Sequence, residues 1–175
     1  AFYGIGGSGW NNVFAVGEAG TVLRYDGASW VAQASTTVRD LYGVWGDDPG
    51  HVVAVGAKGA IVHYDGREWT AMTSGVAANL QAVWGGDAGD LYAVGENGTI
   101  LHGDGMAWTP MPSGTTDALT DVWGSGPTDV FAVGGSGTIR HGDGTAWTHM
   151  ASGVTEALYG VWGSGPTDVF TVGGG

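Results

Sequence analysis

The stretch Leu41-Tyr42-Gly43-Val44-Trp45-Gly46 returns along the chain with a period of 39 residues. Its later copies are Leu80-Gln81-Ala82-Val83-Trp84-Gly85, Leu119-Thr120-Asp121-Val122-Trp123-Gly124 and Leu158-Tyr159-Gly160-Val161-Trp162-Gly163. An earlier copy, Phe2-Tyr3-Gly4-Ile5-Gly6-Gly7, has Gly6 where the others have tryptophan. A fixed period near 40 residues, built from short apolar runs and glycine-rich turns, is typical of a β-propeller. We therefore expect an all-β fold in which each repeat forms one blade.

Each repeat divides into four short strands. In the repeat 41–79 the expected strands cover residues 41–45, 51–55, 60–64 and 69–72. The second of these runs, Val52-Val53-Ala54-Val55, is apolar on both faces, as in a strand that is covered on both sides. Asp65-Gly66 lies between the last two runs and is a strong hairpin signal. The pattern predicts a four-stranded antiparallel blade with tight turns.

The repeats cover the whole chain and stop halfway through the fifth. We expect a single β-propeller domain over residues 1–175, with repeats 2–40, 41–79, 80–118, 119–157 and a half repeat 158–175. This predicts a five-bladed propeller with an incomplete last blade. Residues 167–172 would then form an unpaired apolar edge, through which copies of the chain could self-associate. Three interpretations are favoured: an excerpt of a longer array, an edge covered by a partner, or a tolerated half blade. Assembly of two chains into one larger ring is less favoured, because the half repeats supply no spare hairpins of third and fourth strands.

The composition limits the classes of partner. Five Lys and Arg residues stand against 17 Asp and Glu residues, and the formal net charge is −12. Such a chain repels phosphate backbones, so we expect no nucleic-acid partner. No apolar run is long enough for a membrane span, and no signal peptide is visible at the start. The absence of cysteine excludes disulfides and thiolate chemistry, and we expect no cofactor.

The turns before the fourth strand carry a family resemblance. Tyr25-Asp26-Gly27-Ala28-Ser29-Trp30 resembles a shortened Asp-box, the turn of bacterial neuraminidase-type repeats. Residues 94–108 are similar to the repeats of photosystem II assembly and stability factor-like propellers. Residues 122–134, Val-Trp-Gly-Ser-Gly-Pro-Thr-Asp-Val-Phe-Ala-Val-Gly, look closer still to uncharacterised propeller repeats common in myxobacteria and their relatives. The resemblance implies a bacterial propeller and favours an extracellular or cell-surface location.

The chain also departs from these families. Its Asp-to-Trp spacing is one residue shorter than in the usual Asp-box, and the basic patches of the assembly-factor relatives are missing. No arginine cluster matches a sialidase active site, because the arginines occupy scattered repeat positions: Arg24, Arg39, Arg67 and Arg140. The resemblance therefore predicts the architecture and does not carry an activity.

Two sets of recurring residues are candidate sites. The turn aspartates are Asp26, Asp65, Asp104 and Asp143, and we expect each to accept backbone N–H bonds in its own hairpin. The tryptophans at the end of the first strand are Trp45, Trp84, Trp123 and Trp162. An aromatic platform beside a polar loop is typical of a carbohydrate pocket, which makes this set the candidate ligand-binding residues. The alternative for them is packing between blades, and Gly6 then predicts a narrower junction between the first and last repeats.

No set of residues predicts catalysis or metal binding. His63, His102 and His141 occupy one repeat position, which spreads them over separate blades, so we expect no metal site. The remaining departures from the repeat do not combine an acid, a base and a nucleophile. We therefore predict that the chain is not an enzyme.

The first hypothesis is a non-catalytic binding propeller that presents Trp, Gly and Asp loops to a glycan, as in a lectin, or to a protein. The alternative is a purely structural or interaction module, such as an excerpt of a bacterial surface array or a reconstructed scaffold.

Overall fold

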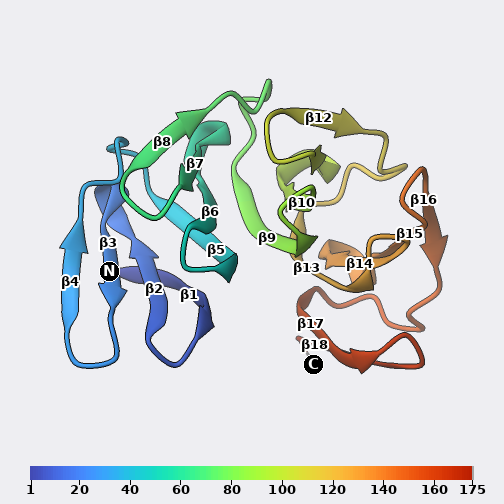
Figure 1. Ribbon diagram of the computed structural model, residues 1–175. Coiled ribbons are helices and arrows are strands. Elements are labelled where there is room, and N and C mark those ends of the chain that lie inside the picture. Colours follow the sequence, from blue (N-terminus) through green and yellow to red (C-terminus); the bar gives the residue numbers. More distant parts are fainter. Residues whose placement is uncertain (175) are drawn as a thin grey trace. The chain divides into compact units, whose positions relative to one another are not determined.

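The computed structural model describes residues 1–174, and these residues form antiparallel sheets joined by tight turns (Figure 1). The first sheet contains β1 (Phe2–Gly9), β2 (Asn12–Gly17), β3 (Val22–Tyr25) and β4 (Trp30–Gln33). The second sheet contains β5 (Leu41–Asp48), β6 (His51–Gly56), β7 (Ile61–Tyr64) and β8 (Trp69–Met72). In both sheets the strands are neighbours in sequence order.

The later sheets repeat the same plan. The third sheet contains β9 (Leu80–Asp87), β10 (Asp90–Gly95), β11 (Ile100–Gly103) and β12 (Trp108–Met111). The fourth contains β13 (Leu119–Gly126), β14 (Asp129–Gly134), β15 (Ile139–Gly142) and β16 (Trp147–Met150). The fifth contains only β17 (Leu158–Gly165) and β18 (Asp168–Gly173). The predicted all-β architecture of four-stranded blades with an incomplete last blade is confirmed.

The chain divides into two compact units, Ala1–Val83 and Trp84–Gly175, with the boundary inside β9. In the first unit, Phe14, Val16 and Val22 of the first sheet pack against the second sheet. The residues of the second sheet in this cluster are Leu41, Val52, Ala54, Ala60, Val62, Tyr64 and Trp69. In the second unit, Val133 of the fourth sheet packs against Leu158 and Val161 of the fifth. Within each unit, neighbouring sheets thus pack against each other through apolar side chains.

The first strand of each repeat is longer than the sequence predicted. We expected it to end near Trp45, with a turn over residues 46–50, but β5 continues to Asp48. The pairing with β6 runs through Gly46↔Val52 to Asp48↔His51, with a register shift between these two pairs. The turn that remains is Pro49-Gly50. A local bulge lets the ladder continue past a glycine that looked like the start of a turn.

The turns between the second and third strands contain single turns of 3₁₀ helix. These are η1 (Glu18–Gly20), η2 (Ala57–Gly59), η3 (Glu96–Gly98) and η4 (Gly135–Gly137). In η2, Lys58 has a φ of 53° and Gly59 a φ of 69°. Within the described residues, no helix is long and apolar enough to cross a membrane.

Gly6 faces the second sheet, which corrects the expected role of this residue at a junction with the last repeat. A Cβ atom at Gly6 would collide with the backbone oxygen of Val44 in β5. The missing side chain therefore lets β1 approach β5 closely. Where the other repeats have tryptophan, the first repeat has only backbone.

Candidate functional site

The turn aspartates organise the hairpins between the third and fourth strands. Asp143 Oδ1 accepts hydrogen bonds from the backbone N–H groups of Thr145 and Ala146, both at 2.8 Å. The other three turns have the same pair of bonds, centred on Asp26, Asp65 and Asp104. The bonds from Ala146 and Thr145 lower the pKa of Asp143 to about 2. Backbone donors likewise lower the pKa of the other three carboxyls.

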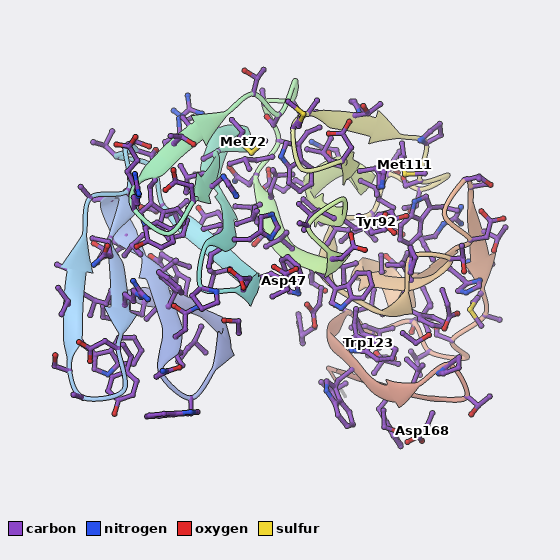
Figure 2. All side chains as sticks on the ribbon, in the orientation of Figure 1. Asp47, Met72, Tyr92, Met111, Trp123 and Asp168 are labelled. Atoms are coloured by element: carbon purple, nitrogen blue, oxygen red, sulfur yellow. The ribbon has the colours of Figure 1, made fainter. Side chains whose placement is uncertain are left out.

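Two of the four first-strand tryptophans stack on an aromatic ring of the second strand in their own sheet. The Trp84 ring stacks on Tyr92 with centroids 6.4 Å apart, and Trp123 stacks on Phe131 at 6.5 Å. Tyr92 and Trp123 are labelled in Figure 2. Trp45 meets His51 edge to face at 5.8 Å. Trp162, in the last sheet, is 61 % exposed. The candidate ligand-binding residues are thus distributed one to a sheet.

Trp84 and Trp123 also reach the next sheet of the second unit. A Cβ atom built on Gly124 would lie 2.6 Å from Trp84 Cη2, and one on Gly163 would lie 2.5 Å from Trp123 Cη2. Only glycine leaves room for an indole at this distance. The recurring Trp-Gly dipeptide therefore encodes an inter-sheet contact, in which the tryptophan of one repeat covers the glycine of the next.

A second set of tryptophans begins the fourth strands. Trp69 meets Phe14 of the preceding sheet edge to face at 5.7 Å, and Trp147 meets Tyr92 at 5.8 Å. The Trp147 ring also lies against Gly142, its cross-strand partner next to the Asp143 turn. Both indoles are buried. These tryptophans hold neighbouring sheets together.

Two histidines each pair with an aspartate of their own sheet, and the two pairs lie in different sheets. His102 Nε2 lies 2.7 Å from Asp90 Oδ1, and His141 Nε2 lies 2.8 Å from Asp129 Oδ1. Burial, and then the charge of a neighbouring histidine, lower the pKa of His63. No group of three potential metal ligands occurs among the described residues.

Ser125 Oγ donates to the other oxygen of Asp129, so a serine, a carboxylate and a histidine stand in one line. The carboxylate sits in the middle of this line. A nucleophilic serine needs the histidine as its direct partner, because the imidazole must take its proton. The line therefore fits a structural tie between the strand turn and β15 and does not assemble a nucleophile.

The site that departs most clearly from the repeat lies in the first unit, where loops of the first two repeats meet. A hollow of about 800 Å³ is lined by Arg39, Lys58, Gly59 and residues 72–77. An adjoining hollow of about 260 Å³ shares Arg39, Gly59 and Met72. We name the two together the Arg39–Lys58 hollow. It is a shallow depression with two cations at its rim and the half-buried Met72 in its wall.

Local contacts hold the Arg39 side chain and the Lys58 backbone. Arg39 Nη1 donates to the backbone oxygen of Lys58 at 2.8 Å. The backbone N–H of Lys58 donates in turn to Asn79 Oδ1 at 2.8 Å. Within residues 1–174, neither cation forms an ion pair with a carboxylate. Both side chains are exposed and available to an anionic group.

Sequence reasoning missed this pair, although a signal for it exists. The positions that match Arg39 in the later repeats hold Ala78, Asp117 and Glu156. Those that match Lys58 hold Ala19, Asn97 and Ser136. Only the junction between the first and second repeats combines two cations. A position-by-position comparison that looks for differences between the repeats therefore identifies both Arg39 and Lys58.

No protein-family model and no curated protein matches the chain. Solved structures do: YCF48 from Cyanidioschyzon merolae is 18 % identical with a TM-score of 0.71, over 93 % of this chain and 61 % of that chain. A structure of YCF48 bound to D1 peptide is 13 % identical with a TM-score of 0.53, over 98 % of this chain and 90 % of that chain. The WD40 β-propeller domain of Doa1 is 10 % identical with a TM-score of 0.83, over 98 % of this chain and 62 % of that domain. The chain thus spans about three fifths of the first and third neighbours, and the likeness identifies its fold as a β-propeller.

Proposed function

We propose that the chain is a non-catalytic propeller that binds an acidic segment of a protein partner in the Arg39–Lys58 hollow. The main observation in support is that two of the chain's five basic residues lie together in this hollow, although the chain has a net charge of −12. Elsewhere the repeats share their turn and packing residues. This junction instead has two cations that, within the described part of the chain, form no ion pair with a carboxylate. A concave surface with a few convergent polar groups and an apolar wall fits a ligand.

Chemistry and fold both support a peptide ligand. A peptide carboxylate accepts hydrogen bonds from guanidinium and ammonium groups, and Met72 offers a deformable apolar contact to a neighbouring side chain. A structure of the neighbour YCF48 is bound to D1 peptide, which supports a peptide as the class of ligand. The net charge of −12 opposes an acidic ligand, so the attraction is confined to the immediate surroundings of this pair.

Peptide selection from a random display library, at low ionic strength, tests the proposal. We expect enrichment of sequences rich in Asp and Glu, with affinities that fall as salt rises. Arg39→Ala and Lys58→Ala should each weaken binding of an enriched peptide about tenfold, the range typical of a charge-assisted contact. Arg67→Ala is the matched control, because Arg67 is also exposed but lies outside the hollow. Enrichment of non-acidic peptides, or equal losses for Arg67→Ala, would contradict this assignment.

A glycan is the second candidate ligand, and the observation that favours it is the exposed indole of Trp162. Ser164 Oγ donates to Asp168 Oδ2 at 2.5 Å in the adjacent turn, which places polar oxygens near the ring. An exposed aromatic face beside such groups suits the apolar face of a sugar. Glycan-array screening with tryptophan fluorescence titration tests this reading. Binding that survives Trp162→Ala would exclude the assigned platform.

A further inference from the structure

The first sheet leaves one apolar face open to solvent. Phe2 is 55 % exposed, Ile5 70 % and Trp30 46 %. Together with Ala15 and Leu23 they line a hollow of about 520 Å³. We name these five residues the Phe2 face. Its apolar area is unusual for a solvent-facing surface of a sheet.

The second sheet shows what covers such a face. Counting 39 residues onward, the Phe2 face becomes Leu41, Val44, Ala54, Val62 and Trp69. Four of them belong to the buried apolar cluster between the first and second sheets, and the partly buried Val44 packs against it. They are covered by Phe14 and Val16 of the first sheet, and the Phe14 ring meets the Trp69 ring at 5.7 Å. The chain itself therefore displays the surface that fits a Phe2-type face.

The last sheet exposes that same complementary surface. Counting 156 residues onward, which is four periods, Phe14 becomes Phe170 and Val16 becomes Val172. Phe170 is 57 % exposed and Val172 67 % exposed. With Trp162 they line a hollow of about 460 Å³. We name these three residues the Phe170 face.

The contact between tryptophan and glycine gives a second, independent match. Trp84 covers Gly124 and Trp123 covers Gly163, one repeat further on. Trp162 is the next member of this series, and its indole is exposed. Gly7 occupies the glycine position in the first repeat, and the atoms nearest to its Cβ direction belong to its own sheet, at Asn12 and Val13. Trp162, on the Phe170 face, is thus an indole that covers no glycine among the described residues. Gly7, beside the Phe2 face, is a glycine that no described indole covers.

We propose that the Phe170 face of one copy of the chain docks on the Phe2 face of a second copy. The contact would reproduce two packings already present inside the chain. Phe170 would lie against the Trp30 ring, as Phe14 lies against Trp69. Trp162 would cover Gly7, as Trp84 covers Gly124. Because two different surfaces meet, the association is head to tail and produces rings or open chains instead of two-fold dimers. A second copy is the occupant because the fit between these faces is already present inside the chain. The high net charge opposes the association, so salt should strengthen it.

Analytical ultracentrifugation over a range of concentrations tests the proposal with two face variants. We expect the unmodified chain to associate, and more strongly at high salt. Ile5→Asp removes the Phe2 face and Phe170→Asp removes the Phe170 face, so each variant alone should stay monomeric. An equimolar mixture should form a one-to-one dimer and no larger species, because each variant keeps the face that the other lacks. That recovery also demonstrates that both variants fold.

Met106→Asp is the matched control, since Met106 is 88 % exposed in the turn between β11 and β12 and lines neither hollow. It should associate as the unmodified chain does. Self-association of either face variant alone would overturn the head-to-tail arrangement in favour of a contact between like faces. A chain that stays monomeric at all concentrations and salt levels would overturn the proposal entirely.

Discussion

Arg140 stands where the first three repeats have Leu23, Val62 and Leu101. Its side chain is buried, with 8 % of its area exposed. One nitrogen donates to the backbone oxygen of Trp147 at 3.3 Å, while Nε has no partner. Among residues 1–174 no carboxylate pairs with it. A guanidinium with so few partners retains much of its desolvation cost.

Replacing this charge with the residue of the other repeats should stabilise the protein. We expect Arg140→Leu to raise the free energy of unfolding by about 1–4 kcal/mol, the gain seen when buried ionic groups become apolar. Urea denaturation at neutral pH measures the change. Arg67→Leu, at an exposed turn, should leave the stability within about 0.5 kcal/mol. A loss of stability in Arg140→Leu would show that the guanidinium contributes more than its single weak hydrogen bond.

The turn aspartates make the stability depend on acid. The pKa of Asp143 is held near 2 in the folded protein, below the ordinary value of an aspartate in an unfolded chain. The unfolded chain therefore takes up the proton first, and the stabilisation, complete above the ordinary pKa, is lost as the pH falls through about 2. Asp143→Ala should lower the melting temperature at pH 7, and the difference should shrink as the pH falls from about 4 to 2.

Asp143→Asn separates charge from geometry, because its amide oxygen can still accept the two backbone bonds. We expect a smaller loss at pH 7 and little further change in the acid range. Differential scanning calorimetry from pH 7 to pH 2 follows all three proteins. If Asp143→Ala remains equally destabilised at every pH, the carboxylate charge contributes nothing to the turn.

At the scale of the elements, the contact between Trp84 and Gly124 joins two sheets. Any side chain at Gly124 meets the indole at 2.6 Å. Gly124→Ala should therefore cost about 1–3 kcal/mol through overpacking. Gly126→Ala is the matched control, because a Cβ atom there meets nothing within 4 Å.

A double-mutant cycle identifies the contact as the cause. Trp84→Ala alone should cost about 3–5 kcal/mol through the cavity that it leaves. In the Trp84→Ala background, Gly124→Ala should cost clearly less than in the unmodified chain, since the ring is gone. Strictly additive losses would mean that the two residues do not contact each other.

The strands were predictable because the repeat shows each of them four or five times, always between the same turn residues. The strand ends were less predictable: the pairing passes through Gly46 by a bulge, and a bulge has no distinct signal in a glycine-rich segment. The packing of Trp69 against Phe14 was missed because the partners lie 55 positions apart in the sequence. The Arg39–Lys58 hollow was missed because its two cations come from loops of two repeats and do not recur.

At the scale of the whole molecule, β14 and β18 have nearly the same sequence but lie in different surroundings. Residues 122–134 and 161–173 differ only at Ala132 and Thr171. In the fourth sheet β14 pairs with β13 on one side and β15 on the other, whereas β18 pairs only with β17. Nearly identical sequences have nearly identical intrinsic exchange rates, so the chain contains its own control for hydrogen exchange.

Residue-resolved hydrogen exchange, at a concentration where the chain is monomeric, tests this architecture most directly. We expect the amides of β14 to exchange at rates limited by opening of the sheets, because both of its edges are bonded. The amides of β18 that point away from β17 should exchange orders of magnitude faster. Equal and strong protection of the two strands would contradict the incomplete last blade, and with it the propeller described for this chain.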